Sequence, residues 1–263
     1  MLPTIMLKPL KNNTETILTD FILLNQLQES VNDKGLFKAV FVCGIPGAGK
    51  SYTTAKLTDG AIQPRIVNSD KVYEFLGKKG AVDITHADAA WTEVGSKVQQ
   101  TTSSMLAQYI NGMLPLFIDS TSSSPANLLR RKGILESFGY DCALVWVDVD
   151  LETALTRAKQ RKREVPEEFI RATYEQATKA REYLMSRFDM VLPLSNSDGQ
   201  LTDAVLHQAF KSSTAFFNGE LQNYIGIDTL DKLKQSGEKY LAPTVRSPQQ
   251  IQHGVAAWYS TAP

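Results

Sequence analysis

A glycine-rich segment at residues 44–51 constrains this chain more than any other feature of its sequence. It reads Gly-Ile-Pro-Gly-Ala-Gly-Lys-Ser, directly follows the apolar run 39–43 and precedes a stretch compatible with a helix. A strand that leads through such a loop into a helix is the pattern of a phosphate-binding loop. Because glycine adopts backbone conformations closed to other residues, successive N–H groups can converge on phosphate oxygens at the helix N-terminus. The segment therefore predicts a site for a nucleoside triphosphate.

Two polar side chains at the end of this loop have predicted roles of their own. We expect Lys50 to reach the β- and γ-phosphates and the Ser51 hydroxyl to bind Mg²⁺. The predicted cofactors are therefore ATP and Mg²⁺. The residues predicted to bind the nucleotide are Gly44, Gly47, Ala48, Gly49, Lys50, Ser51 and Tyr52.

Charge and composition restrict the partners of the chain. It contains 28 basic and 28 acidic residues, so no global field attracts it to nucleic acid or to a membrane, and any polyanion site must be a local patch. No uninterrupted apolar run approaches the ~20 residues of a membrane-spanning helix, and the sequence predicts no membrane partner. Cys43 and Cys142 lie in apolar runs, where a free thiol acts as a small hydrophobic group, which predicts a reducing cytoplasm. Nothing in the sequence predicts the oligomeric state.

Apolar runs alternate with helical periodicity from residue 39 to about residue 196. This alternation builds a parallel sheet with helices on both faces, so we expect an α/β P-loop NTPase fold with helical extensions at both ends. Strands are expected at 39–44, 65–69, 116–119, 143–149 and 190–194, and helices at 49–58, 70–78, roughly 91–113, from 124 onward, 151–163 and 166–187. Pro193 would suit an edge of the sheet or the end of a strand.

The predicted organisation has three parts. Residues 1–37 form an N-terminal helical extension, residues 38–197 the central P-loop domain and residues 198–263 a C-terminal extension. Glycines are expected to separate short helices in the C-terminal extension, at positions Gly219, Gly226 and Gly237.

Two carboxylates follow predicted strands, close to the edge where a parallel sheet places its substrates. Asp70 follows the second strand and can orient and deprotonate an attacking hydroxyl. Its alternative is to cap the helix that starts at Lys71. Asp119 ends the third strand and is predicted to hold Mg²⁺ together with Ser51. The alternative for Asp119 is to cap the turn at 120–122.

Basic residues form two further candidate groups. The predicted helix at 151–163 ends in a cluster of cations that can close over the nucleotide and neutralise charge on the transferring phosphoryl group. The cluster consists of Arg157, Lys159, Arg161, Lys162 and Arg163. Arg130 and Arg131, on the helix that follows residue 124, are candidates to bind a substrate phosphate. Both groups have the same alternative, a solvated helix face.

Three segments together resemble the P-loop kinases grouped around bacteriophage polynucleotide 5′-kinase and the zeta-toxin nucleotide-sugar kinases. They are the loop at 44–51, Asn-Ser-Asp at 68–70 and Arg-Lys-Arg-Glu-Val-Pro at 161–166. The resemblance covers about residues 38–196. It implies that the central domain is a kinase that acts in the cytoplasm, which is the host cytoplasm if the chain is phage-encoded.

The resemblance also implies roles for particular residues. The lysine and serine of the loop would handle phosphates and Mg²⁺, Asp70 would activate the acceptor hydroxyl, and Arg161 or Arg163 would contact the γ-phosphate. One position departs from the polynucleotide kinases, which carry an arginine three residues after the acceptor aspartate to hold the substrate phosphate. This chain has Tyr73 there, which weakens the assignment to nucleic-acid 5′ ends.

The leading hypothesis is an ATP-dependent kinase that phosphorylates a hydroxyl of a nucleic acid or a nucleotide-derived molecule. A polynucleotide 5′-hydroxyl or a hydroxymethylated base of phage DNA is one acceptor, and a nucleotide sugar, as for the zeta toxins, is the other. A different class of function is a nucleotide-binding switch or scaffold that transfers nothing. Replacement of Asp70 discriminates between the classes, because only a kinase would lose its rate while it keeps its affinity for ATP.

Overall fold

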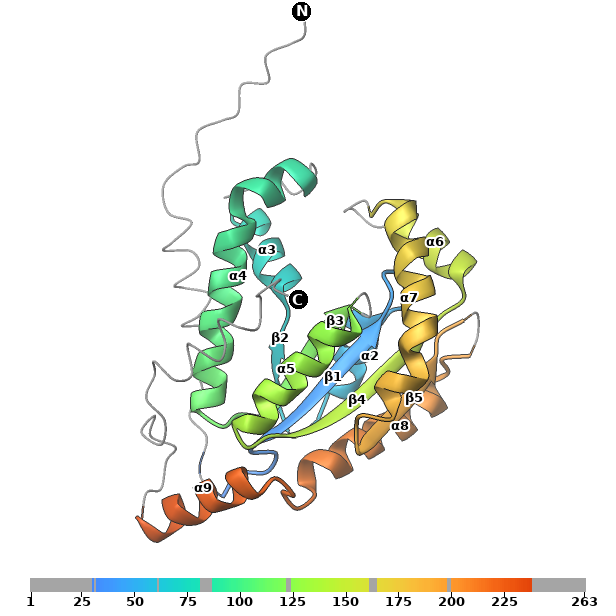
Figure 1. Ribbon diagram of the computed structural model, residues 1–263. Coiled ribbons are helices and arrows are strands. Elements are labelled where there is room, and N and C mark those ends of the chain that lie inside the picture. Colours follow the sequence, from blue (N-terminus) through green and yellow to red (C-terminus); the bar gives the residue numbers. More distant parts are fainter. Residues whose placement is uncertain are drawn as a thin grey trace, which may run out of the picture.

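The chain folds around one parallel sheet. The computed structural model describes residues 30, 32–60, 62–80, 87–121, 124–160, 165–197 and 200–237. Within these ranges five strands lie in the order β2-β3-β1-β4-β5, and every pair of neighbours is parallel (Figure 1). The predicted α/β fold is confirmed. Most of the predicted N-terminal extension and the tail from residue 238 lie outside the described residues.

The strands are β1 (Lys38–Gly44), β2 (Arg65–Val67), β3 (Leu116–Thr121), β4 (Asp141–Asp148) and β5 (Met190–Ser195). The central strand β1 is buried at all of its positions, as expected for a continuous apolar run in the middle of a parallel sheet. Pro193 lies in the edge strand β5, in agreement with the prediction. Strand β2 ends at Val67, two residues earlier than predicted, because Asn68 already caps the next helix.

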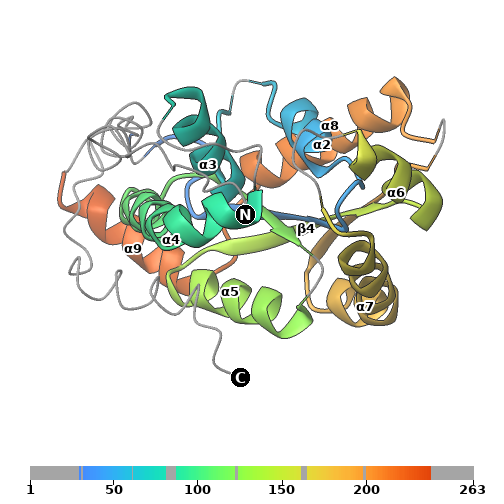
Figure 2. The same ribbon diagram turned by 90° about the horizontal axis from the view of Figure 1, so that it is seen from above.

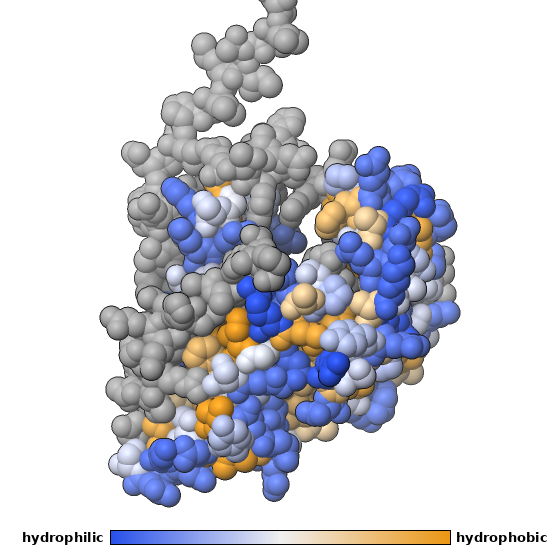
Figure 3. Space-filling model, in the orientation of Figure 1, coloured by the Kyte–Doolittle hydropathy of each residue, from blue (hydrophilic) through white to orange (hydrophobic). Residues whose placement is uncertain are grey.

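The helices are α2 (Lys50–Leu57), α3 (Ser69–Lys78), α4 (Ala87–Asn111), α5 (Pro125–Ser137), α6 (Leu151–Lys159), α7 (Glu167–Met185), α8 (Asp203–Asn218) and α9 (Tyr224–Gln235). Figure 2 shows α5 and α7 on one face of the sheet and α2 and α8 on the other. Hydrophilic side chains cover the outward side of α7, as Figure 3 shows. Helices α3 and α4 pack against each other, and α4 also packs on the edge strand β2.

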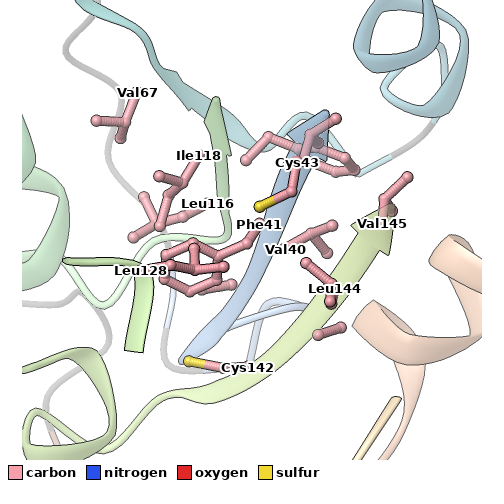
Figure 4. Packing of buried hydrophobic residues seen from close by; sticks show 14 of the residues in the cluster. Val40, Phe41, Cys43, Val67, Leu116, Ile118, Leu128, Cys142, Leu144 and Val145 are labelled. Carbon is pink, nitrogen blue, oxygen red and sulfur yellow. The ribbon is translucent and has the colours of Figure 1, made fainter. Parts of the chain in front are cut away.

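Apolar side chains of β1, β3 and β4 form the core between these helix layers (Figure 4). Phe41, Phe117 and Trp146 are almost completely buried, and burial of a side chain of this size stabilises the fold by about 1.5–3 kcal/mol. Cys43 and Cys142 are free and buried, and burial is the main cause that raises the pKa of the Cys43 thiol to about 12. Both thiols therefore act as small hydrophobic groups, as predicted. Within the described ranges, no helix combines the length and the apolar character that crossing a bilayer requires.

Part of the C-terminal region is joined to the sheet at the end opposite the glycine-rich loop. Lys38 Nζ lies 2.7 Å from Asp141 Oδ2, and both side chains are largely buried. The same ammonium donates to the carbonyl of Glu220, and the Asp141 carboxylate accepts from the backbone N–H groups of Gln222 and Asn223. This buried ion pair therefore holds the segment between α8 and α9 against β1 and β4.

The role predicted for Gly226 is wrong. This glycine does not separate two helices but lies inside α9, where a Cβ atom would collide with the backbone of Gly139. The missing side chain lets the helix approach the loop before β4, so the reason for the glycine is packing and not a break in the helix. Gly219 lies between α8 and α9, as predicted, and Gly237 follows α9 at the end of the described residues.

We expect Lys38→Met to lower the free energy of unfolding by about 3 kcal/mol, because it leaves the buried Asp141 carboxylate without its counter-ion. Urea denaturation measures this loss. The matched control is Lys232→Met, which removes an exposed ion pair with Asp228 at 2.6 Å and should cost about 0.5 kcal/mol or less. Equal losses in the two variants would contradict the structural role of the buried pair.

Candidate active site

The glycine-rich loop leaves β1 at the carboxyl edge of the sheet and enters α2. Gly47 has φ 86° and Gly49 has φ 89°, both in the left-handed region that favours glycine. Gly49 is the N-cap residue of α2, and no side chain caps this helix. The N–H groups of the loop and of the first helical turn therefore meet at one concave backbone surface, which is the geometry that binds phosphate.

Residues outside the loop pack so closely against these two glycines that no side chain fits at either position. A Cβ atom at Gly47 would fall on the backbone of Ala154 in α6, and a Cβ atom at Gly49 would fall on the side-chain amide of Asn196. Both the dihedral angles and the contacts exclude larger residues. The loop conformation is therefore imposed by its neighbours as well as by its own sequence.

Lys50 begins α2 and folds back over the start of the loop. Its ammonium donates to the carbonyl oxygens of Gly44 at 2.9 Å and Ile45 at 3.2 Å. The same charge lowers the pKa of Cys43 in opposition to burial, which places the ammonium near the end of β1. A cation there fits the predicted contact with the terminal phosphates of a nucleotide.

Ser51 and Asp119 meet at one cavity of about 290 Å³ beside the loop. Asp119 lies in β3 opposite Val42 of β1, so the parallel register brings its carboxylate to the edge where the loop begins. Its Oδ2 accepts a hydrogen bond of 2.8 Å from Asn68 Nδ2. This contact joins Asp119 to the end of β2 and to the start of α3.

The donor set fits Mg²⁺. Ser51 offers a hydroxyl and Asp119 a carboxylate, and Mg²⁺ binds through one or two protein oxygens together with phosphate and water. The described part of the chain contains no cluster of three or more His, Cys, Asp or Glu side chains that could enclose a metal ion. A metal at this site would therefore take its remaining ligands from the nucleotide and from solvent.

Asp70 lies in the first turn of α3 and is exposed. The alternative that it caps this helix is wrong, because the cap is Asn68. The Asn68 side chain accepts from the Asp70 N–H at 2.7 Å, and the helix already begins at Ser69. The sequence assigned no role to Asn68, whose amide group bonds both the Asp119 carboxylate and the backbone N–H of Asp70.

The structure describes two of the four arginines that the sequence proposed for phosphate binding. Burial raises the pKa of the Cys43 thiol, and the charge of Arg131 is a minor cause that lowers it. Arg130 donates to Asn127 within α5, at 3.2 Å. Arg161 and Arg163 lie outside the described residues, and α6 ends at Lys159. No described contact tests the predicted role of any of these arginines.

Two tyrosines that the sequence singled out, Tyr52 and Tyr73, differ in how exposed they are. Tyr52 is 51% exposed on α2, and the Lys56 ammonium lies 5.8 Å from the centre of its ring. Tyr73 is only 2% exposed and packs in the core. In the polynucleotide kinases the corresponding position carries a substrate-binding arginine. In this chain the side chain at position 73 points away from solvent.

Asn196, which follows β5, is a candidate that the sequence did not reveal. Its side-chain Nδ2 donates to the carbonyl of Ala48 in the loop at 2.7 Å. Its backbone N–H donates to Asp148 at 2.7 Å, and its carbonyl accepts from Arg157 Nη1 of α6 at 2.8 Å. One residue thus joins the loop, the end of β4 and the last turn of α6. A separation of 148 residues between Asn196 and the loop leaves no sequence signal for this contact.

A second cavity of about 330 Å³ lies between the loop and α7. There Asp148 accepts from Trp146 Nε1 at 2.6 Å and from Arg181 Nε at 2.9 Å. Arg181 and Asp148 form an ion pair at the end of β4. This pair fixes α7 beside the loop.

We expect Asn196→Ala to weaken ATP binding about fivefold to tenfold, because the Ala48 carbonyl loses its donor and the loop is less preorganised. Isothermal titration calorimetry with ATP measures the change. Asn218→Ala is the control, since Asn218 is exposed at the end of α8 and the substitution should leave the affinity unchanged. Unaltered ATP affinity in the Asn196 variant would contradict the role given to this contact.

Solved structures of other proteins are similar to this chain. A chain of the PezAT chromosomal toxin–antitoxin system of Streptococcus pneumoniae is 16% identical, with a TM-score of 0.52, and the match covers 87% of this chain and 98% of that chain. Shikimate kinase from Bacteroides thetaiotaomicron is 14% identical with a TM-score of 0.42, and the match covers 66% of this chain and 94% of the other. A chain of the Pnkp1/Rnl/Hen1 RNA repair complex is 18% identical with a TM-score of 0.44, over 60% of this chain and 48% of the other.

Comparisons of sequence, rather than of structure, assign the chain to a family. No curated protein shows significant similarity to it. The family described as the AAA domain matches residues 40–184, which is more than half of the chain and includes the loop, both predicted carboxylates and most of α7. With its parallel sheet and phosphate-binding loop, the fold is that of a kinase-like P-loop NTPase. The chain belongs to the AAA domain family.

Proposed function

We propose that the protein is an ATP- and Mg²⁺-dependent kinase that transfers the γ-phosphate to a hydroxyl of a nucleic acid or a nucleotide-derived molecule. The observation that carries this proposal is the hydrogen-bonded connection from Asp119 through Asn68 to the first turn of α3, beside the loop. It brings a predicted metal ligand and the predicted base Asp70 to the same edge of the sheet as Lys50. A site that only binds nucleotide needs no carboxylate at the start of α3.

The proposed reaction proceeds by in-line displacement at the γ-phosphorus. Loop N–H groups and Lys50 hold the phosphates, and Asp70 accepts the proton of the acceptor hydroxyl as its oxygen bonds to phosphorus. The bond from the γ-phosphorus to the bridging oxygen breaks, and ADP leaves. Mg²⁺ held by Ser51 and Asp119 would neutralise charge on the phosphate oxygens. Arg161 and Arg163 remain the proposed cations that close over the nucleotide.

We also propose which group of P-loop kinases the protein belongs to. The segments that resemble the bacteriophage polynucleotide kinases and the zeta toxins support a kinase of that type, with catalysis in residues 38–197. The PezAT chain supports the same fold, and at 16% identity it supports nothing about substrate. Two buried free thiols, Cys43 and Cys142, favour a reducing cytoplasm as its location.

A transfer assay with γ-labelled ATP tests the proposed activity. The acceptors are an oligonucleotide with a 5′-hydroxyl, a duplex that contains hydroxymethylated bases, and a set of nucleotide sugars. We expect transfer of label to at least one of these hydroxyls. Binding of ATP without transfer to any acceptor would favour the switch or scaffold instead.

We expect Asp70→Asn to lower kcat at least 100-fold, because the amide cannot accept the proton of the hydroxyl. The ATP affinity should change less than twofold, since Asp70 lies on α3 and not in the loop. Asp203→Asn is the matched control, an exposed carboxylate in the first turn of α8, and it should keep full activity. If the Asp70 variant transfers phosphate at the rate of the unmodified protein, Asp70 is not the base.

A further inference from the structure

A further cavity lies at the end of the sheet opposite the glycine-rich loop. Its volume is about 540 Å³, which is more than that of either cavity beside the loop. Its wall comes from the turn before β1, the segment that joins α2 to β2 and the second half of α8. Helices α2 and α8 pack against each other on one face of the sheet, as Figure 2 shows. We call this space the α2–α8 cavity.

Apolar side chains form one part of the wall of the α2–α8 cavity, and two of them, Leu57 and Phe217, belong to the buried core. The apolar residues are Leu57, Ile62, Pro64, Pro115, Phe210 and Phe217. An apolar group that leaves water for such a surface gains free energy in proportion to the area that it buries. This part of the wall therefore favours a ligand with an apolar body.

Three ionisable side chains give the α2–α8 cavity a net positive charge. Lys34 and Arg65 each contribute one positive charge and Asp33 one negative charge, so the net charge is +1. The Asp33 carboxylate already accepts the backbone N–H of Ser30 at 2.5 Å, which closes the turn before β1. A ligand with a single negative charge balances the charge that remains.

The two cations contribute to the cavity in different ways. Arg65 begins β2 and is partly buried, and its Nη1 donates to the carbonyl of Gln63 at 3.4 Å. A guanidinium binds a carboxylate through two parallel N–H groups, which fixes the orientation of the carboxylate. Lys34 is exposed, and in the described part of the chain its ammonium forms no hydrogen bond or ion pair. Arg65 therefore offers directed hydrogen bonds, and Lys34 offers charge on the side of the solvent.

Volume and charge together define the class of ligand. A volume of about 540 Å³ lies within the range of sites for small molecules. A phosphate monoester carries nearly two negative charges at neutral pH, so the Asp33 carboxylate opposes its second charge. A carboxylate carries one charge and matches the fork of a guanidinium. The α2–α8 cavity thus favours a carboxylic acid over a phosphate ester.

We propose that the α2–α8 cavity binds an apolar monocarboxylic acid, with its carboxylate on Arg65 and Lys34 and its apolar body against Leu57 and Phe210. Among the described residues, the cavity shares no lining residue with either cavity beside the loop, so it is separate from the predicted nucleotide site. The bound acid joins the turn before β1 to the end of α2 and stabilises the folded chain by mass action. This inference does not depend on the proposed kinase activity.

Isothermal titration calorimetry of the full chain with phenylpropionate and with octanoate tests the inference for an aromatic and an aliphatic acid. We expect at least one of them to bind at a single site, with the same affinity when ATP is present at saturation. The uncharged amide of that acid should bind at least tenfold more weakly. Arg65→Gln should weaken binding at least tenfold, and Thr214→Trp, which fills the cavity from α8, should abolish it. Lys78→Gln, at the exposed end of α3, is the control and should change nothing.

Two exposed residues of the cavity give opposite expectations. Lys34→Gln removes a positive charge and should weaken binding of the acid about threefold. Asp33→Asn removes a repulsive charge but keeps an acceptor for the N–H of Ser30, and it should tighten binding about threefold. ATP affinity within twofold of the unmodified protein shows that each variant is folded. If Arg65→Gln or Thr214→Trp loses ATP affinity, the pair at positions 33 and 34 decides the question.

Three results would overturn the inference. They are no binding of either acid at millimolar concentration, displacement of the acid by ATP, and equal affinity for an acid and its amide. Equal affinity for the acid in the Lys34 and Asp33 variants would overturn it as well. Each of these results leaves the proposed kinase in place, because the transfer assay with labelled ATP does not involve this cavity.

Discussion

The backbone conformation of the loop between β1 and α2 is the constraint on which the candidate site depends. Gly47 and Gly49 have left-handed dihedral angles and pack so closely against α6 and Asn196 that no Cβ atom fits. Asn196 adds a hydrogen bond to Ala48 in the loop and holds Arg157 of α6 through its carbonyl. The loop is thus preorganised by elements that come later in the chain, and binding of phosphate needs little further ordering.

The parallel sheet explains why the polar candidates converge. All strands run in one direction, so residues that follow β1, β2 and β3 meet at the same edge. Asn68 uses this proximity twice, since its amide donates to Asp119 and its oxygen caps α3. The opposite ends of the strands have a structural role. There the buried ion pair of Lys38 and Asp141 holds the segment between α8 and α9. Chemistry and structural support are therefore separated along the strands.

Much of the fold was predictable, and the errors have physical causes. The continuous apolar runs of β1 and β4 identified these strands because burial acts on each segment of the chain locally. The end of β2 was misplaced because the side chain of Asn68 forms a helix cap, which a strand pattern does not show. Gly226 was misinterpreted as a break because its partner, Gly139, is distant in the sequence. The extent of α8 and α9 was predicted only in outline.

By itself the sequence determined that the chain has a phosphate-binding loop in a parallel α/β fold, and it singled out Lys50, Ser51, Asp70 and Asp119 as candidates. These conclusions follow from local spacing and from glycine stereochemistry. Only the tertiary structure decided that Asn68 connects Asp119 to the start of α3, that Asn196 holds the loop and that Tyr73 is buried. The physical reason is that hydrogen bonds and packing between distant segments depend on how the strands align, and no short pattern of residues encodes that alignment.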